Sequence, residues 1–444
     1  MRNPTRKHKN RTLNLYKGIF LSVILLGSPQ ETFAAKKKAP VETQKKAEMP
    51  ETEKAEEKSK EESKTESKSE ATSTPPKNPV IAAAMRIETL AQQAIVLDYH
   101  TGRVVFEKNA NQQMHPSSMT KIMTAYMAFD RLKKGIVSLE TPIFVSEKAW
   151  RMGGSRMYIN VNSQVSMEEL LHGIIIQSGN DACVAIAEGL SGSEEVFAAE
   201  MTQKATELGC TQTNFKNASG WPDPEHLSSA RDLSIIARRI IQDYPENYDL
   251  FGKLDYTYNK ITQPNRNPLL DKNIGCDGLK TGFTDLGGYG LVASSKEITS
   301  EGNEKRFVVV VNGLSSSKIR AAESLKLMTW AMKTFATMPI AKKGQILANV
   351  DVSAGAERTV GLTIAEDAYA TFPQVAKNEV KTDLVYDRSV QAPIKVGQVL
   401  GKAVVTVPTF EIPIEIDLIA TKDIKRAGFF KRIWNSIAHV FGGA

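Results

Sequence analysis

Two spacings of apolar residues run through the middle of the chain and predict helices packed on an antiparallel sheet. Apolar runs separated by turn residues predict two β-hairpins, with strands at 94–98, 103–107, 289–295 and 306–313. Apolar residues at helical spacing predict helices at 117–132, 167–177, 181–190 and 318–337. Because the strands come from both ends of this region and the helices from between them, we expect an α+β domain over residues 81–339.

After Pro339 the pattern changes. Short β-like runs, separated by Gly, Pro, Asn and Asp, occupy residues 359–364, 368–372, 379–386, 404–407 and 412–419. This texture is typical of a small all-β domain, which we expect over residues 340–422.

The N-terminus has the pattern of an export signal. A basic stretch is followed by a short apolar run and then by small residues at Thr32, Ala34 and Ala35, which predicts a signal peptide over residues 1–35. An uncleaved anchor is the alternative, and both place the rest of the chain outside the cytoplasm. Residues 36–80 consist almost wholly of Lys, Glu, Ala, Ser, Thr and Pro, a composition that predicts a disordered tether.

The C-terminal segment is predicted to be an amphipathic helix within residues 423–444. Phe430, Ile433, Trp434 and Ile437 share one face, and basic or polar residues such as Lys431 occupy the other. A basic helix with aromatic residues on its apolar face suits a membrane surface, although such a helix could instead dock on the β domain.

Composition and charge narrow the function classes. The 444 residues are 41% hydrophobic and 24% charged, with a net charge of +7 that forms no stripe typical of nucleic-acid binding, so no nucleic-acid partner is expected. The three cysteines, Cys183, Cys210 and Cys276, lack CxxC spacing, which argues against a disulfide scaffold and a zinc ribbon. Buried free thiols are favoured over one oxidised pair. No metal site or cofactor is expected.

The first candidate for catalysis is Ser118-Met-Thr-Lys121, at the start of the helix predicted at 117–132. Positions three apart lie on one face of a helix, so the lysine amine can reach the serine hydroxyl. A serine becomes a good nucleophile when a neighbour removes its proton, and a lysine can do so once burial or a nearby cation lowers its pKa. Alone, this motif is equally typical of a helix start with a surface lysine.

Two further motifs follow in order. Ser178-Gly-Asn180 lies between two predicted helices, where it supplies a hydroxyl for proton relay and an amide to hold a substrate carbonyl; a plain turn is the alternative. Lys280-Thr-Gly282 offers a cation and a hydroxyl for a free carboxylate, if it lies on a strand rather than in a solvated loop. Gly282 would let a substrate backbone approach the strand edge. Together the three motifs are unlikely to arise by chance.

This set resembles the penicillin-recognising serine enzymes, which comprise penicillin-binding proteins and serine β-lactamases. Longer stretches resemble the low-molecular-mass penicillin-binding proteins that are D-alanyl-D-alanine carboxypeptidases, from about residue 85 to the C-terminus. They are His115-Pro-Ser-Ser-Met-Thr-Lys121, Gln177-Ser-Gly-Asn-Asp-Ala-Cys-Val184, Ser228-Ser-Ala-Arg-Asp232, Asn265-Arg-Asn267 and Asp277-Gly-Leu-Lys-Thr-Gly282. The tether at 36–80 lies outside the resemblance.

The resemblance implies a role for each matching residue. Ser118 is the acylated nucleophile and Lys121 its base, with Ser178 and Asn180 on one wall. The terminal carboxylate falls to Lys280 and Thr281, and the oxyanion to the backbone N–H groups of Ser118 and Phe283. Some members have His where this chain has Phe283, which puts the hydrolysis rate and pH response in doubt. Arg266 and Arg320 match arginines near the carboxylate pocket, with surface ion pairs as the alternative.

The implied reaction is removal of the terminal D-alanine from peptidoglycan stem pentapeptides, with β-lactams as inhibitors that acylate Ser118. A β-lactamase is the first alternative, but no E-x-x-L-N segment lies between Asn180 and Lys280. A D,D-endopeptidase or transpeptidase of the same fold stays open. A non-catalytic wall-binding protein would be expected to lack Ser118, Lys121 or Lys280, and all three are present. A Ser-His-Asp enzyme is disfavoured because no G-x-S-x-G elbow occurs.

Overall fold

The computed structural model describes residues 78–428, apart from 408, 411 and 412. The chain divides into two compact units, Met1–Ser69 and Glu70–Ala444, and all described residues belong to the second. The predicted signal peptide, residues 36–77 of the predicted tether and residues 429–444 of the predicted C-terminal amphipathic segment lie outside the described residues. Among the helices that are described, none is long and apolar enough to cross a membrane.

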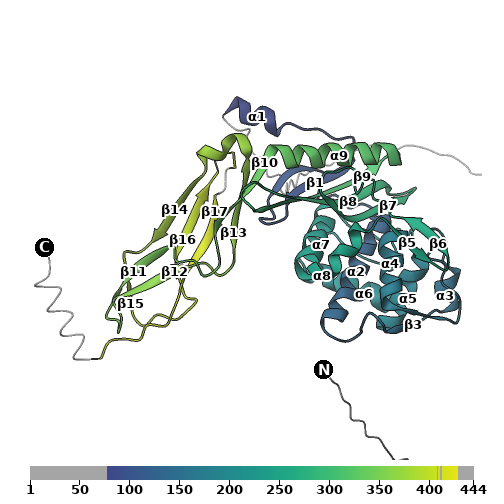
Figure 1. Cartoon of the computed structure of the whole chain (residues 1–444), viewed down its shortest axis with the longest axis horizontal. Coiled ribbons are helices and arrows are strands. Elements are labelled where there is room, and N and C mark those ends of the chain that lie inside the picture. Colours follow the sequence, from purple (N-terminus) through teal and green to yellow (C-terminus); the bar gives the residue numbers. More distant parts are fainter. Residues whose placement is uncertain (1–77, 408, 411–412, 429–444) are drawn as a thin grey trace, which may run out of the picture. The chain divides into compact units, whose positions relative to one another are not determined.

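A five-stranded antiparallel sheet forms the centre of the first domain (Figure 1). Its strands, in spatial order, are β2 (Val104–Lys108), β1 (Gln93–Asp98), β9 (Glu304–Leu314), β8 (Gly288–Ile298) and β7 (Cys276–Thr284). Both predicted hairpins are confirmed, since β1 pairs with β2 and β8 with β9. The prediction that strands from the two ends of the domain share one sheet is also confirmed, because β1 pairs with β9. Strand β7 lies at the edge of the sheet.

Helices cover both faces of this sheet, which explains why its central strands are almost wholly apolar. On β9, Val308 and Val310 pack into the core shared with the helices of one face. Val309 and Val311 point the other way, into a core that they share with the last helix of the domain. In Figure 1 that last helix, α9 (Ser317–Thr334), lies on one side of the sheet and the larger helical group on the other.

The larger helical group carries most of the catalytic motifs. Its members are α2 (Lys121–Lys133), α3 (Glu147–Arg151), α4 (Met167–His172), α5 (Asn180–Ser191), α6 (Glu194–Glu207), α7 (Ala230–Asp243) and α8 (Pro245–Tyr248). Two small two-stranded sheets accompany it: β3 (Pro142–Phe144) pairs with β4 (Gln164–Ser166), and β5 (Asp255–Tyr258) forms a hairpin with β6 (Ile261–Pro264). A short helix, α1 (Pro79–Met85), precedes β1.

The structure modifies three of the four helix predictions. The segment predicted as a helix at 117–132 begins with a 3-10 turn, Ser117–Thr120, before α2. The segment at 167–177 is α4 followed by a π-helical turn, Gly173–Gln177. The prediction at 318–337 is wrong for its last three residues, because α9 ends at Thr334 and Phe335 starts a strand. Phe335 is fully buried and pairs with Pro373, so tertiary pairing overrides the helical pattern there.

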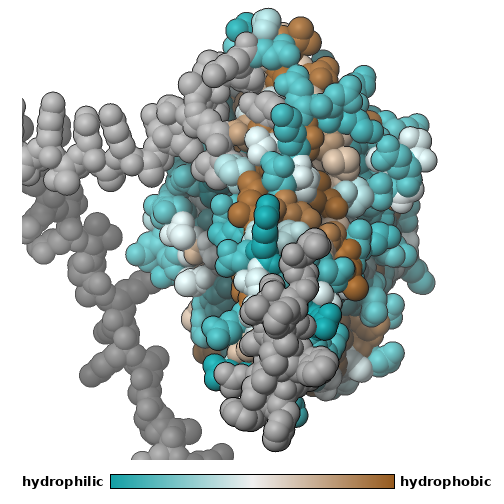
Figure 2. Space-filling view, turned by 90° about the vertical axis from the view of Figure 1, so that its left-hand side faces the viewer, coloured by the Kyte–Doolittle hydropathy of each residue, from teal (hydrophilic) through white to brown (hydrophobic). Residues whose placement is uncertain are grey.

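The β-like runs after Pro339 do form strands, as predicted. A six-stranded sheet contains, in spatial order, β14 (Lys381–Tyr386), β16 (Val399–Thr406), β17 (Ile414–Ala420), β12 (Thr359–Thr363), β11 (Ala348–Ser353) and β15 (Ser389–Gln391). Strands β10 (Phe335–Ala341) and β13 (Ala368–Pro373) form a separate pair. In this region sequence reasoning missed β10, β11 and β15. On the surface seen in Figure 2, hydrophobic patches lie between hydrophilic side chains.

Candidate active site

The turn that carries Ser118 is held tightly against strand β7. Ser117 has a φ of 50°, in the left-handed region that non-glycine residues seldom adopt. Its hydroxyl lies 2.8 Å from the Thr284 hydroxyl at the end of β7. A Cβ atom on Gly282 would come within 2.8 Å of the Pro116 carbonyl oxygen. The close approach that requires a glycine at position 282 therefore comes from this turn, rather than from the substrate backbone that the sequence suggested.

Lys121 lies beneath Ser118 with its amine in contact with three oxygen atoms. Its Nζ is 3.0 Å from the Ser118 Oγ, 2.7 Å from the Asn180 Oδ1 and 2.6 Å from the Ser219 carbonyl oxygen. The Asn180 amide is oriented by its other end, because its Nδ2 donates to the Gly153 carbonyl oxygen at 2.8 Å. Asn180 Oδ1 and the Ser219 carbonyl oxygen can only accept hydrogen bonds. The predicted contact between the Ser118 hydroxyl and the Lys121 amine is thus present.

These contacts decide the direction of the lone pair of Lys121. A neutral amine has two N–H groups and one lone pair. When the two N–H groups donate to the Asn180 and Ser219 oxygens, the third position, which faces the Ser118 hydroxyl, holds the lone pair. The hydroxyl then donates to the amine, and this is the geometry in which a general base removes a proton.

Burial makes this neutral form accessible. Lys121 is 1% exposed, and burial, assisted by the positive charge of Arg266, lowers its pKa to about 8. The nearby Cys183, Asp181 and Glu194 act in the opposite direction and raise the pKa. With a pKa of about 8, roughly one lysine in ten is neutral at pH 7, against fewer than about one in a thousand for an ordinary lysine.

The Ser178-Gly-Asn180 motif connects the π-helical turn to α5. Ser178 is buried and has a φ of 60°, so the chain reverses sharply between the two helical segments. π-Helical turns are rare and often occur at functional sites. The structure brings Asn180 into direct contact with Lys121, which the sequence did not indicate.

Cations surround the position of Lys280: Lys121 is buried, Arg320 is half-buried and Arg266 is exposed. The Lys280 side chain is 2% exposed on strand β7, and its pKa is held well below its usual value by burial and by the charges of Lys121 and Arg266. Arg320 also lowers the pKa of Lys280, and Arg320 has a buried Nε atom without a hydrogen-bond partner among the described residues. The motif thus lies on a strand, as one interpretation of the sequence required, and its neighbours repel one another. An anion bound here would relieve that repulsion.

The two arginines come from separate elements. Arg266 follows β6 and donates to the Ser155 hydroxyl, while the flanking Asn267 donates from its Nδ2 to the Gly278 carbonyl oxygen at 2.8 Å and so ties the arginine loop to β7. Arg320, on α9, lies over the Tyr289 ring at 5.7 Å. Among the described residues neither arginine makes an ion pair, which was the alternative interpretation of the sequence; Arg266 instead donates to Ser155 and Arg320 lies over Tyr289.

Phe283 presents its side chain to solvent beside this group. It is 49% exposed, and its ring stacks on Tyr289 with 4.2 Å between the ring centroids. His226 lies behind the nucleophile turn as a buried core residue. Its Nδ1 accepts from the Lys216 N–H, so its Nε2 carries the proton and donates to the Thr120 hydroxyl at 2.8 Å. Burial lowers the pKa of His226 to about 4, which keeps the ring neutral.

Sequence reasoning missed the segment around Ser219, whose carbonyl oxygen contacts Lys121. A backbone acceptor leaves no residue-type signal, so no motif could have revealed it. The three cysteines are free: Cys183 and Cys210 are buried, as expected, and Cys276 is half-buried. Among the described residues, no group of three or more His, Cys, Asp or Glu is placed to hold a metal ion. A cavity of about 750 Å³, lined by residues within 132–141 and 243–247, contains none of the predicted site residues.

Comparison with known proteins identifies the family. A family model described as D-alanyl-D-alanine carboxypeptidase matches residues 78–315, and a second, described as the C-terminal domain of penicillin-binding protein 5, matches residues 335–426. The D-alanyl-D-alanine carboxypeptidase DacA of Haemophilus influenzae is 37% identical over 350 residues, covering 78% of this chain and 88% of that protein. The chain belongs to the D-alanyl-D-alanine carboxypeptidase family.

Solved structures agree with this assignment. The structure of penicillin-binding protein 5 from Haemophilus influenzae matches with a TM-score of 0.72 and 37% identity, over 77% of this chain and 99% of that one. Penicillin-binding protein D2 from Listeria monocytogenes, solved in its ampicillin-bound form, matches with a TM-score of 0.51 and 27% identity, over 56% of this chain and 99% of that one. The protein is therefore a serine-type D-Ala-D-Ala carboxypeptidase with the fold of the low-molecular-mass penicillin-binding proteins, as the sequence predicted.

The lowered pKa of Lys121 predicts how the carboxypeptidase responds to pH. Because only the neutral amine can accept the Ser118 proton, the rate of acylation by a labelled penicillin should rise about tenfold per pH unit below the pKa. The rise should level off near pH 8, where the pKa of Lys121 lies. Stopped-flow measurement between pH 5.5 and 9 checks this. A rate that is flat from pH 6 to 9 would contradict the assignment of the base.

Proposed function

We propose that Ser118 attacks the carbonyl between the last two D-alanines of a peptidoglycan stem pentapeptide while Lys121 takes its proton. The observation that supports this most strongly is the orientation of the Lys121 amine, whose two N–H groups are taken by the Asn180 and Ser219 oxygens and whose third position faces Ser118. The bond between serine Oγ and the peptide carbon forms, and D-alanine then leaves with the proton that the lysine received.

The terminal carboxylate of the peptide is assigned to the cation group around Lys280. Lys280, Arg266 and Arg320 provide positive charge, and Thr281 provides a hydroxyl on the same strand. A bound carboxylate forms charge-assisted hydrogen bonds and offsets the repulsion that now lowers the pKa of Lys280. A substrate that ends in a free carboxylate is thereby distinguished from one that continues, which favours a carboxypeptidase over an endopeptidase at this site.

Strand β7 and the serine turn provide the remaining groups. As the edge of its sheet, β7 can accept the extended peptide as an additional strand, an arrangement used by many peptide-binding proteins. The backbone N–H groups of Ser118 and Phe283 are assigned to the oxyanion, since the turn and the strand are in contact at Gly282. Because this donor at position 283 is backbone, the phenylalanine side chain does not interfere with it. Ser178, on the wall of the site that also carries Asn180, is assigned to proton relay. After D-alanine has left, water hydrolyses the acyl-enzyme.

β-Lactams are proposed to acylate the same serine. The Listeria relative was solved in an ampicillin-bound form, and the fold is shared. A penicillin presents the carbonyl of its β-lactam ring and the carboxylate of its adjoining ring in a similar arrangement to the D-alanyl-D-alanine end, so the same cations and serine would engage it. In the carboxypeptidase this adduct should hydrolyse slowly, in contrast to the rapid turnover of a β-lactamase.

The location of the enzyme is also a proposal, supported by the sequence. The basic and apolar segments within residues 1–35 favour export, and residues 36–80 favour a flexible tether. Phe430, Trp434 and the basic residues around them favour attachment of the C-terminal segment to the outer face of the cytoplasmic membrane. Peptidoglycan lies on that side of the membrane, which agrees with the proposed substrate.

Replacement of the nucleophile tests the catalytic assignment. We expect S118A to release D-alanine from a stem pentapeptide at a rate lowered by a factor of about 10³ or more. S118A should also form no covalent adduct with a labelled penicillin. The neighbouring variant S117A keeps the Ser118 hydroxyl and should still form the adduct, with the label mapping to Ser118 by peptide mass spectrometry. Retention of D-alanine release by S118A would contradict the assignment. Rapid hydrolysis of penicillin by the unsubstituted protein, without release of D-alanine from the pentapeptide, would favour the β-lactamase alternative.

Removal of the C-terminal segment tests the membrane proposal. A chain ending at residue 427 should appear in the soluble fraction of exported material, whereas the full chain should sediment with membranes, because burial of aromatic and aliphatic side chains in the interface is lost. The two chains should acylate with penicillin at equal rates. A truncated chain that still sediments with membranes would show that another segment attaches the protein.

A further inference from the structure

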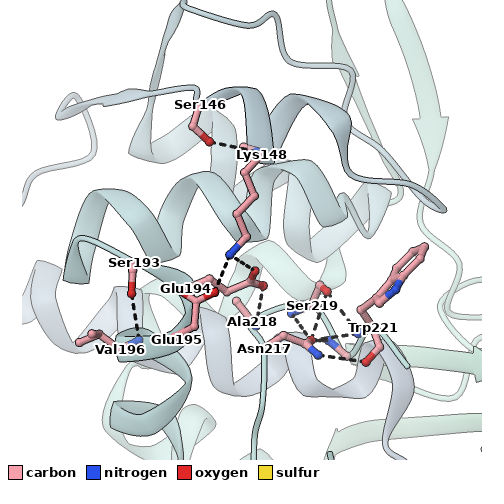
Figure 3. Close-up of polar contacts among 12 residues, drawn as sticks. Ser146, Lys148, Ser193, Glu194, Glu195, Val196, Asn217, Ala218, Ser219 and Trp221 are labelled. Atoms are coloured by element: carbon pink, nitrogen blue, oxygen red, sulfur yellow. Dashed lines mark hydrogen bonds and ion pairs between the residues drawn. The ribbon is translucent and has the colours of Figure 1, made fainter. Parts of the chain in front are cut away.

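The backbone carbonyl that contacts Lys121 belongs to a turn that is closed by one asparagine. Figure 3 shows Asn217 at the centre of this turn, with its side chain directed at the backbone of the residues that follow. Its Oδ1 accepts from the N–H groups of Ser219 at 3.2 Å, Gly220 at 2.8 Å and Trp221 at 3.0 Å. These bonds fix the shape of the turn, but they are internal and do not determine where the turn lies relative to Lys121.

The position of the turn is determined at Ala218, which is attached on both sides. Its N–H donates to the Glu194 Oε1 at 3.1 Å, and its carbonyl oxygen accepts from the Thr124 hydroxyl at 2.5 Å. Glu194 begins helix α6, and Thr124 follows Lys121 by three residues on α2. Ala218 and Thr124 are fully buried. Ala218 is therefore hydrogen-bonded to two helices, α6 and α2. Of its two partners, only Glu194 lies outside the helix that carries Lys121.

Burial of the Glu194 carboxylate at this position costs folding free energy. Its side chain is almost fully buried, and a buried carboxylate is unfavourable unless it is paired. Lys148 provides the pairing, with its Nζ 3.1 Å from the Glu194 Oε2 and 2.9 Å from the Glu195 Oε1 (Figure 3). The helix start itself does not need Glu194, because Ser193 caps α6 through the Val196 N–H at 3.2 Å. An acidic side chain also favours a helix N-terminus, but Glu195 gives the same benefit without contacting the turn.

We propose that Glu194 is a positioning residue for acylation, which acts by holding the Ala218 N–H and thereby fixing the Ser219 carbonyl oxygen against the Lys121 amine. The proposal rests on the role of Lys121 as the base. If the carbonyl moves away, one N–H group of the neutral amine loses its acceptor and is free to rotate toward Ser118, which displaces the lone pair. Errors of about 1 Å in such a contact can lower a rate about 10²-fold.

Glu194 also contributes a negative charge to the surroundings of Lys121. The groups that face Lys121 are Cys183 and Asp181 on α5, Glu194 on α6, Lys280 on β7 and Arg266 after β6. Of the two acids, Asp181 is occupied by the N–H groups of the segment that starts at Met157. Loss of the Glu194 charge removes one influence that raises the pKa of Lys121, so the neutral amine should form at lower pH. Contact and charge thus have separable consequences.

Three variants of the full chain separate them. E194A removes both the contact and the charge, and E194Q removes the charge but keeps an oxygen that can accept from the Ala218 N–H. E195A is the matched control, since it loses the other Lys148 partner at the same helix end and leaves the turn untouched. For each, the limiting acylation rate of Ser118 by a labelled penicillin, the dissociation constant of the preceding complex and the pH midpoint are measured, with the melting temperature recorded alongside.

E194A should lower the limiting acylation rate about tenfold or more while the dissociation constant of the initial complex stays the same. E194Q should keep the rate on the pH plateau to within about threefold and move the midpoint to lower pH, because the pKa of Lys121 falls. E195A should match the parent in rate and midpoint. A purely structural role for Glu194 would lower the melting temperature but leave the rate of the folded protein unchanged.

The proposal is overturned if folded E194A acylates at the parent rate. It is equally overturned if E194Q loses the plateau acylation rate of the parent and its pH midpoint does not move. If E194A fails to fold, the E194Q measurement decides. The S118A variant distinguishes a failure of the Glu194 proposal from a failure of the proposed nucleophile. If S118A forms no adduct and E194A behaves like the parent, only the positioning role of Glu194 fails, whereas an adduct on S118A would mean that the proposed nucleophile itself is wrong.

Discussion

The structure depends on an amine that is buried against two carbonyl oxygens. Lowering the pKa of Lys121 from 10.5 to about 8 corresponds to about 3 kcal/mol in favour of the neutral form. Burial supplies most of that change, but burial alone would leave the lone pair undirected. The Asn180 and Ser219 oxygens supply the direction, because both can only accept. Catalysis and folding are therefore joined here, since the same contacts that satisfy a buried cation also aim a base.

The rest of the fold serves to bring three distant segments to this amine. Helix α2 carries Lys121, the start of α5 carries Asn180, and the edge strand β7 carries Lys280. Strand β7 approaches the serine turn so closely that position 282 has no room for a side chain. The apolar cores on both faces of the sheet hold these segments in place. The cations around Lys280 therefore stay close together despite their mutual repulsion, and they form a site for an anion.

Much of this could be predicted from the sequence, for identifiable reasons. The order of the three motifs specified Ser118, Lys121 and Lys280, and apolar spacing specified four of the five strands of the central sheet, all except β7. The end of α9 could not be predicted, because Phe335 leaves the helix only to pair with β13, far away in sequence. Ser219 and Glu194 were also inaccessible. The first acts through its backbone, and the second acts on a backbone N–H 24 residues away, so neither leaves a pattern in residue types.

The most direct test of this account is a titration of Lys121 itself, followed by NMR of the labelled side chain in the full chain, with K121R used to assign the signal. The orientation and burial of the amine predict a midpoint near pH 8. A midpoint near the 10.5 of an ordinary lysine would mean that the amine stays charged in the working range and cannot be the base that activates Ser118.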